Sequence, residues 1–123
     1  MGNPVVHWEI GAGDANGLVE FYGKLFDWKI QKATGMDYHM VETVAPGTPG
    51  GLNGGIMQVQ PGVPPFLTFY IQVDDLQAHL DKAQALGGRV IMPSTPIPGI
   101  GSFAMFQDPQ GNAVGIYKQL DPK

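Results

Sequence analysis

Hydrophobic and polar residues alternate along Val5-Val6-His7-Trp8-Glu9-Ile10, a pattern typical of a β-strand. Apolar residues then recur at helical spacing from Leu18 to Phe26, and Asp14 is placed to cap that helix by accepting from its free backbone N–H groups. Three shorter strands are predicted over residues 28–33, 38–44 and 52–59, separated by turn-forming and Pro/Gly-rich segments. The first half therefore has the predicted order β-α-β-β-β.

The second half repeats this order. A strand is predicted over residues 66–73, followed by a helix that begins after Asp75 and ends at Gly87-Gly88. Three more strands are predicted over residues 89–92, 101–107 and 112–117, and the segment from Pro93 to Gly101 is expected to break regular structure. Asp108-Pro109-Gln110-Gly111 has the residue types of a tight turn between the last two strands.

The two halves match in kind at an offset of 61 residues, which pairs His7 with Thr68 and Asp14 with Asp75. Any two amphipathic strand–helix segments could align this well, but the repeated order of all five elements favours a duplication. We therefore predict an α+β fold made of two βαβββ modules, about residues 4–60 and 65–119, in one domain spanning residues 1–123.

Composition narrows the function classes. The net charge is −4 and the seven Lys and Arg residues are scattered, which weighs against a nucleic-acid partner. The absence of cysteine excludes a disulfide, a thiolate nucleophile and a cysteine-based metal site. No apolar run approaches a membrane span, and the first residues lack the order of a secretory signal. We expect a cytoplasmic protein with no membrane partner.

Several motifs resemble those of the vicinal oxygen chelate superfamily, which includes glyoxalases, bleomycin resistance proteins and dioxygenases. In the first module these are His7-Trp8-Glu9-Ile10, Asp14, and the segment Phe21-Tyr22-Gly23-Lys24-Leu25-Phe26-Asp27-Trp28. In the second they are Val73-Asp74-Asp75, Ala85-Leu86-Gly87-Gly88 and Asp108-Pro109-Gln110-Gly111-Asn112. The resemblance covers residues 5 to 118. It implies a cupped eight-stranded mixed sheet around a pocket, with helices on the convex face, and a homodimer.

The resemblance also implies where a metal would be bound, because metal enzymes of that family carry four ligands on equivalent strands. His7 matches the first position, whereas the second-module positions fall on Thr68 and Gly115. The remaining position falls on Met57, or on Gln58 if the loop shifts the register by one residue. Threonine and glycine are poor ligands for a divalent metal. We therefore expect no cofactor, with a divalent metal as the open alternative.

Strand alternation places His7 and Glu9 on one face and Val6, Trp8 and Ile10 on the other, apolar face, which should pack on helices. His7 can be a hydrogen-bonded structural residue, a ligand contact or acid–base group, or a metal ligand. Glu9 can be an ordinary residue at an open sheet end, or a buried carboxylate that acts as a base or pairs with a cationic ligand.

The second module adds Thr68 and Tyr70 to the pocket face in the same way, and Phe103 is a further candidate for its wall.

These residues support two hypotheses about function. The first is a metal-independent protein that binds a small, partly aromatic or cationic organic molecule. The second is a lyase or isomerase that uses Glu9 and His7 as an acid–base pair, with or without an unusual metal. A third reading is a dimerising module with no small-molecule role.

Overall fold

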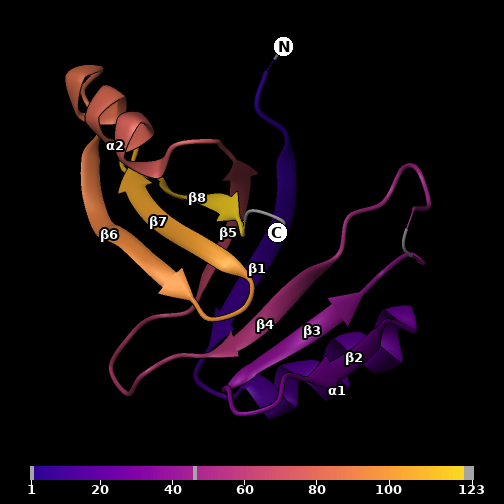
Figure 1. Cartoon of the computed structure of the whole chain (residues 1–123). Helices are drawn as coiled ribbons and strands as arrows, with labels where there is room; N and C mark the ends of the chain where they lie inside the picture. Colours follow the sequence, from indigo (N-terminus) through magenta and orange to yellow (C-terminus); the bar gives the residue numbers. More distant parts are fainter. Residues whose placement is uncertain (1, 46, 121–123) are drawn as a thin grey trace. The chain divides into compact units, whose positions relative to one another are not determined.

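A computed structural model describes residues 2–45 and 47–120 of the chain, and Figure 1 shows its elements. The chain divides into two compact units. Among the described residues, the N-terminal unit comprises residues 7–68, and the C-terminal unit comprises residues 69–120 together with residues 2–6. Both divisions fall inside strands, so the first and fifth strands contribute residues to both units.

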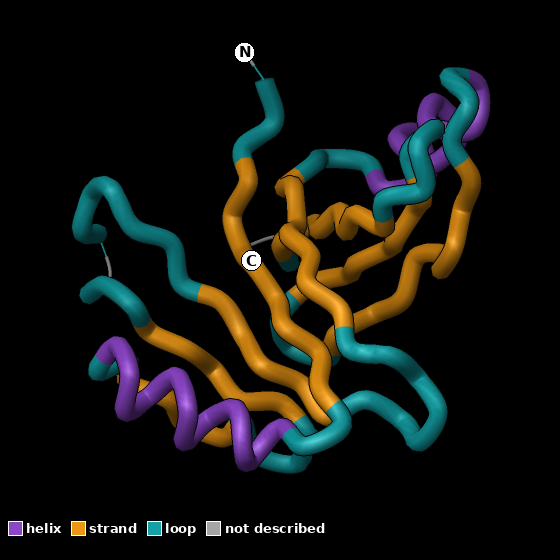
Figure 2. Tube along the Cα trace, turned by 180° about the vertical axis from the view of Figure 1, so that it is seen from behind, coloured by secondary structure: helices purple, strands orange, loops and turns teal. Residues whose placement is uncertain are grey.

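The N-terminal unit is built from β1 (Val5–Ala12), α1 (Ala15–Phe26), β2 (Lys29–Lys32), β3 (Tyr38–Glu42) and β4 (Gly54–Gln58). β1 pairs with β4 in parallel, whereas β4 with β3 and β3 with β2 are antiparallel pairs. Figure 2 shows α1 along one face of these strands. The parallel pair requires a crossover between its strands, which α1, β2 and β3 provide.

The C-terminal unit repeats the plan with β5 (Phe66–Gln72), α2 (Leu76–Ala85), β6 (Arg89–Ile97), β7 (Gly101–Gln107) and β8 (Ala113–Gln119). β5 pairs with β8 in parallel, and β8, β7 and β6 follow as antiparallel neighbours. The eight strands have the hydrogen-bonding order β2-β3-β4-β1-β5-β8-β7-β6. The predicted α+β class, with an eight-stranded mixed sheet and the βαβββ order in each half, is confirmed.

Both helices begin where their predicted caps place them. The Asp14 carboxylate accepts a hydrogen bond from the Gly17 N–H at 3.0 Å, and the Asp75 carboxylate accepts one from the Ala78 N–H at the same distance. These bonds satisfy backbone donors that have no partner within the first helical turn. The matched caps fix the point at which each β-strand gives way to a helix.

Each unit has its own hydrophobic core. In the N-terminal unit, Trp8 and Ile10 of β1 pack with Val41 and Ile56 against the inner side of α1. The predicted apolar face of β1 therefore does pack on the helix, and His7 and Glu9 are left on the opposite face. In the C-terminal unit, the core under α2 is formed by apolar residues of the helix and the neighbouring strands: Val73, Leu76, Leu80, Ala104 and Ile116.

The structure corrects the expected break after residue 92. β6 continues through Pro93 and Pro96 to Ile97, and only the hairpin from Ile97 to Gly101 is irregular. β6 has a strand on one side only, so a proline can stand in it where a backbone N–H would face away from that strand. One of the two register irregularities, between Met92 and Thr95, contains Pro93, whereas Pro96 keeps Ser102 of β7 as its register partner. Within the described residues, neither helix is long and apolar enough to cross a membrane.

Candidate functional site

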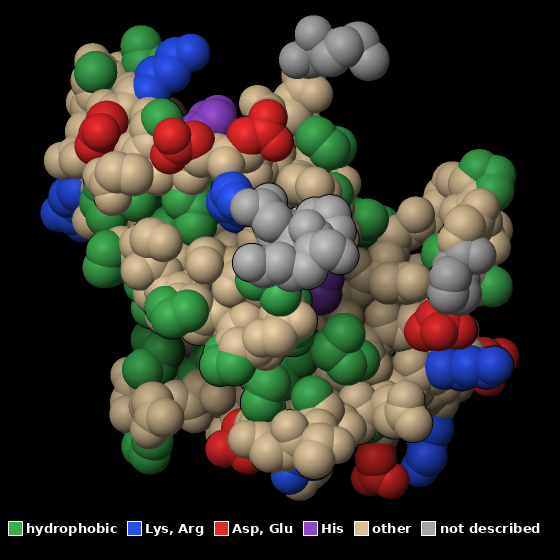
Figure 3. Space-filling view, viewed as in Figure 1, with side chains coloured by type: hydrophobic (Ala, Val, Ile, Leu, Met, Phe, Trp, Pro, Cys, Tyr) green, Lys and Arg blue, Asp and Glu red, His purple; other side chains and the backbone are tan. Residues whose placement is uncertain are grey.

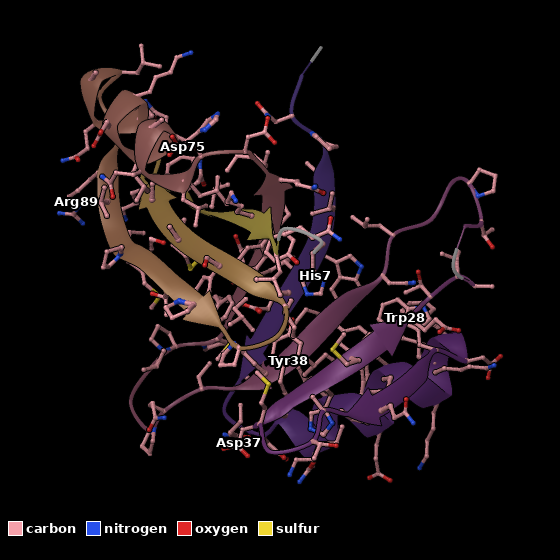
Figure 4. The ribbon with its side chains drawn as sticks, in the orientation of Figure 1. His7, Trp28, Asp37, Tyr38, Asp75 and Arg89 are labelled. Carbon is pink, nitrogen blue, oxygen red and sulfur yellow. The ribbon has the colours of Figure 1, made fainter. Side chains whose placement is uncertain are left out.

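The candidate site in the N-terminal unit centres on His7, whose side chain lies on the face of β1 that does not meet α1. The His7 Nε2 atom and the Tyr38 hydroxyl oxygen are 2.6 Å apart, a hydrogen bond between β1 and β3. The two rings are nearly parallel, with centroids 6.3 Å apart and an interplanar angle of 21°. Figure 4 shows both side chains on their strands. His7 is thus held by a specific partner.

A glycine in β4 makes this contact possible. The register places Gly55 opposite Glu9 of β1 and Met40 of β3. A Cβ atom built on Gly55 would overlap the outer end of the Tyr38 ring. Since β3 and β4 are adjacent, the Tyr38 ring crosses over the backbone of β4 to reach β1. A side chain at residue 55 would exclude the ring from that path.

Partial burial changes the protonation of the imidazole. Desolvation lowers the pKa of His7 below its ordinary value of 6.5, because the charged form loses hydration inside the protein. The side chain is therefore neutral at neutral pH. A neutral imidazole has one nitrogen that donates and one that accepts.

Glu9 and Thr68 are the two buried polar residues among those described, each with 6% of its surface exposed. No buried side-chain nitrogen or oxygen in the described part of the chain lacks a hydrogen-bond partner. The buried polar side-chain atoms of Glu9 and Thr68 therefore have hydrogen-bond partners. A buried, satisfied carboxylate beside an imidazole can take part in proton transfer when a substrate displaces its partner.

The structure also places Met57 and Gln58, the two candidates for the fourth-strand position. Met57 faces the same side as Tyr38, its register partner on β3. The Gln58 amide is engaged at the start of α1, where its oxygen accepts from the Ala15 N–H at 3.0 Å and its nitrogen donates to the Gly13 carbonyl at 2.6 Å. Gln58 thus serves the connection between β1 and α1.

The C-terminal unit contains a similar arrangement around Gly115. Gly115 lies opposite Tyr70 of β5 and Met105 of β7, and a Cβ atom built on it would overlap the Tyr70 ring. Tyr70 has 8% of its surface exposed and meets Phe103 edge to face, with centroids 6.2 Å apart and an interplanar angle of 73°. In this unit an aromatic ring fills the space beside the glycine.

The two glycines occupy equivalent places. Gly55 lies opposite Glu9 as Gly115 lies opposite Tyr70, and Glu9 and Tyr70 are 61 residues apart, the offset that relates the modules. The counterpart of Gly115 in the first module is therefore Gly55, not Met57 or Gln58. Neither position carries a side chain that could reach a metal ion.

A cavity of about 520 Å³ opens on the His7 side of the N-terminal unit. It is lined by one imidazole, one thioether, two amides and two charged groups: His7, Met40, Gln31, Asn53, Lys29 and Glu42. The Asn53 side chain is held in place by hydrogen bonds to the backbone. Its Oδ1 accepts from the Thr43 and Val44 N–H groups, and its Nδ2 donates to the Val44 carbonyl. The volume is typical of a small-molecule site.

A second cavity, of about 530 Å³, lies where β1 leads into α1 and includes Gly11, Leu18 and Phe66. Its one ionisable lining residue is Asp14, whose carboxylate already caps the helix. The His7 cavity is therefore the better candidate.

On the face seen in Figure 3, basic and acidic side chains are intermingled, with no basic stripe of the kind that nucleic acids require.

The residues present do not suit a metal ion. Among those that the structure describes, no group of three or more His, Cys, Asp and Glu side chains is arranged to hold one. In addition, Nε2 of His7 is already bonded to Tyr38. A divalent ion in a nitrogen and oxygen site needs at least three protein ligands.

The sequence pattern did not identify Tyr38 or Gly55 as site residues. A usable signal was present, because consecutive glycines at residues 54 and 55 stand inside a predicted strand. Glycine within a strand marks a close approach by another group. Trp8 makes that approach at Gly54 from the helix side of the sheet, and Tyr38 makes it at Gly55 from the opposite side.

Comparison with known proteins gives a family match over most of the chain. Residues 5–116 match the model of the glyoxalase/bleomycin resistance protein/dioxygenase superfamily. A putative glyoxylase, CFP32, from Mycobacterium tuberculosis is 30% identical over 116 residues, covering 85% of this chain and 41% of that protein. The anthracycline biosynthesis protein DnrV from Streptomyces peucetius is 28% identical over 125 residues, covering 91% and 46%. The chain thus spans less than half the length of these relatives.

Solved structures show the same fold. A Mn(II)-bound glyoxalase from Novosphingobium aromaticivorans superposes with a TM-score of 0.66 at 14% identity, over 98% of this chain and 42% of that chain. Methylmalonyl-CoA epimerase from Mycobacterium tuberculosis superposes with a TM-score of 0.62 at 13% identity, over 95% and 88%. At these identities the likeness concerns the fold alone.

Replacing Gly55 by Ala tests the ring contact. We expect Gly55→Ala to force the Tyr38 ring off β4 and to lower the free energy of unfolding by about 1–3 kcal/mol, measured by urea denaturation. Gly13→Ala is the matched control, since a Cβ there meets nothing within 4 Å. The cost of Gly55→Ala should largely disappear in a Tyr38→Ala background. Equal costs in both backgrounds would show that the ring is not the obstacle.

The lowered pKa of His7 has a consequence for stability. Because the folded pKa lies below 6.5, the unfolded chain takes up this proton first as the pH falls. Stability is therefore lost on acidification from pH 6.5 down through the folded pKa, and this contribution should be absent from His7→Gln. We expect the free energy of unfolding of the wild type to decrease more than that of the variant. Parallel pH profiles would contradict the shift.

Proposed function

Because this chain belongs to the glyoxalase/bleomycin resistance protein/dioxygenase superfamily, we propose that it binds a small aromatic molecule on the His7 face of its sheet. The ligand binds without a metal ion, unlike the substrates of the family's metal enzymes. The site is the cavity of about 520 Å³ in the N-terminal unit. Its walls combine apolar surface with a few polar groups, as small-molecule sites do.

The observation that carries the proposal is the pair of tyrosine rings over glycines. Tyr38 covers Gly55 and Tyr70 covers Gly115. The two strand positions from which a side chain would coordinate a metal ion in the family's metal enzymes therefore carry no side chain. Of the positions that the family's metal enzymes use, His7 alone keeps a strong ligand type. A single imidazole does not hold a divalent ion against water. What these faces offer a ligand is hydrogen-bonding groups and aromatic surface.

An aromatic ligand is favoured by the side chains available. Met40 lines the His7 cavity and is 51% exposed, and a thioether adapts to the faces of planar rings. In the C-terminal unit, Phe103 and Tyr117 are register partners, and Tyr70 packs edge to face with Phe103. The relative DnrV, described as an anthracycline biosynthesis protein, supports an aromatic compound as the first class to test.

Binding of a defined probe tests the proposal. We expect anthraquinone-2-sulfonate to bind with the same Kd in EDTA as in buffer with added Mn²⁺ or Ni²⁺, measured by isothermal titration calorimetry. Met40→Trp should fill the cavity and raise the Kd at least about tenfold, or roughly 1.4 kcal/mol. Met36→Trp, at a 45% exposed residue in the β2–β3 connection, is the matched control. Binding that appears only with metal would refute the metal-free site.

A second candidate function is supported by the burial of Glu9. This carboxylate lies on the same face of β1 as His7 and is 94% covered, so the two could serve as the acid–base pair of a lyase or isomerase. Such an enzyme would exchange a proton of a bound carbonyl compound with solvent. This step requires one group to remove the proton and another to return it.

Substitution of Glu9 separates the two functions. If the protein is an acid–base catalyst, Glu9→Gln should abolish deuterium incorporation from D₂O into a bound carbonyl compound, followed by NMR, and leave the Kd nearly unchanged. Glu42→Gln, at a carboxylate on the cavity rim, is the control and should retain the exchange. Exchange that persists in Glu9→Gln would eliminate this mechanism.

A further inference from the structure

We propose that Asn53 selects the ligand of the His7 cavity by donating a hydrogen bond from its side-chain amide to an uncharged acceptor, such as the carbonyl oxygen of an aromatic ketone or quinone. Asn53 lines the cavity and immediately precedes β4. This role rests on the proposed function and deepens it, because it names the chemical group that the aromatic ligand must carry.

The Asn53 amide has a single possible orientation. A backbone N–H group can only donate a hydrogen bond, and a backbone carbonyl can only accept one. The atom that accepts from the Thr43 N–H at 2.7 Å and from the Val44 N–H at 3.1 Å is therefore the oxygen, Oδ1. The atom that donates to the Val44 carbonyl at 3.1 Å is the nitrogen, Nδ2. The identity of both amide atoms follows from the chemistry of their partners.

These bonds determine what Asn53 can offer a ligand. An amide oxygen has two lone pairs, and the Thr43 and Val44 N–H groups occupy both. The amide nitrogen carries two hydrogens, of which one is donated to the Val44 carbonyl. The second hydrogen has no acceptor within the part of the chain that the structure describes. Asn53 therefore meets the cavity as a donor, and the group that it binds must be an acceptor.

The donor is held in place before a ligand arrives. Its three hydrogen bonds to Thr43 and Val44 fix the amide against the backbone that follows β3. Gln31 is the other amide on the cavity wall, but it is exposed and its side chain has no hydrogen bond to the described residues. Ordering a free side chain costs conformational entropy, which a fixed side chain does not lose again. Asn53 is therefore the better placed of the two amides to select a ligand.

The charges beside Asn53 favour an acceptor without a charge. Lys29 of β2 and Glu42 of β3 are register partners, and both line the cavity. Opposite charges on neighbouring strands compensate each other, so this end of the wall has no net charge. An anionic acceptor would gain from Lys29 and be repelled by Glu42. A carbonyl oxygen accepts the hydrogen bond from Asn53 without that repulsion.

The same wall gives the ligand a direction. Met40 lies on the same face of β3 as Glu42 and also lines the cavity. Its thioether suits the face of an aromatic ring. A planar ligand can thus pack its ring on Met40 and point a carbonyl oxygen toward Asn53.

The contact can be observed in ¹H–¹⁵N spectra of the full wild-type chain, which resolve the two hydrogens of each asparagine amide. Anthraquinone-2-sulfonate and anthracene-2-sulfonate share a ring system and a sulfonate, and the first adds two carbonyl acceptors. Ring currents act with both probes, so the difference between them reports the hydrogen bond. We expect the anthraquinone alone to move the Asn53 hydrogen that does not face Val44 downfield. Asn16, exposed on α1, is the internal control and should not move.

Substitution of Asn53 tests the contact by affinity. We expect the wild type to bind the anthraquinone at least about tenfold more tightly than the anthracene. Asn53→Asp keeps an oxygen for the Thr43 and Val44 N–H groups and removes the N–H, so the preference should fall to about twofold or less. The ratio of the two Kd values is the readout, because a change in local structure or charge affects both probes. Gln31→Ala is the matched control and should keep the preference.

Equal Kd values in the wild type, or an unchanged ratio in Asn53→Asp, would overturn the role of Asn53 and leave the proposed function standing. Loss of the preference in Gln31→Ala alone would assign the selection to Gln31 and overturn the proposal as well. If neither probe binds the wild type, the proposed function fails and the role of Asn53 fails with it. If Asn53→Asp does not fold, the wild-type spectra decide the contact, and the same downfield shift with both probes would refute it.

Discussion

The site depends on the close approach of a tyrosine ring to a strand that has no side chain at the point of contact. Tyr38 reaches His7 because Gly55 leaves the backbone of β4 uncovered, and the hydrogen bond of 2.6 Å follows from that path. The ring thus passes over residue 55, which is equivalent to Gly115, a position where the family resemblance implies a metal ligand. Gly55 therefore offers no side chain for coordinating a metal ion, and it leaves room for the hydrogen bond between Tyr38 and His7.

The two modules reach this arrangement with different residues. In the N-terminal unit the ring comes from β3, and Glu9 stands opposite the glycine, whereas in the C-terminal unit Tyr70 of β5 stands opposite Gly115 and supplies the ring itself. Glu9 therefore occupies the module position that Tyr70 fills in the other half. The duplicated framework places one buried carboxylate and one buried phenol at equivalent points. This difference allows the halves of one fold to take different roles toward a ligand.

Sequence alone was sufficient for what depends on local pattern. The two aspartate caps, the alternation that separates His7 from Trp8, and the repeated order of elements are fixed by short-range chemistry. The passage of β6 through its prolines was not predictable locally, because it depends on β6 having a strand on one side only. The register of β4 against β1 could not be predicted either. The length of chain that the Pro/Gly-rich segment before β4 takes up cannot be read from the sequence, so the residue of β4 that lies opposite a given residue of β1 was not known. For that reason Met57 and Gln58 were considered, and Gly55 and Tyr38 were not.

The central claim is that this face of the sheet offers a hydrogen-bonding imidazole and aromatic surface in place of a metal centre. Metal content tests it most directly: the chain is produced in medium supplemented with manganese, nickel, zinc and iron, dialysed without chelator, and analysed by mass spectrometry of the native protein and by elemental analysis. The account predicts far less than one bound ion per chain, unchanged in His7→Gln. One tightly held ion per chain, lost in His7→Gln, would contradict it.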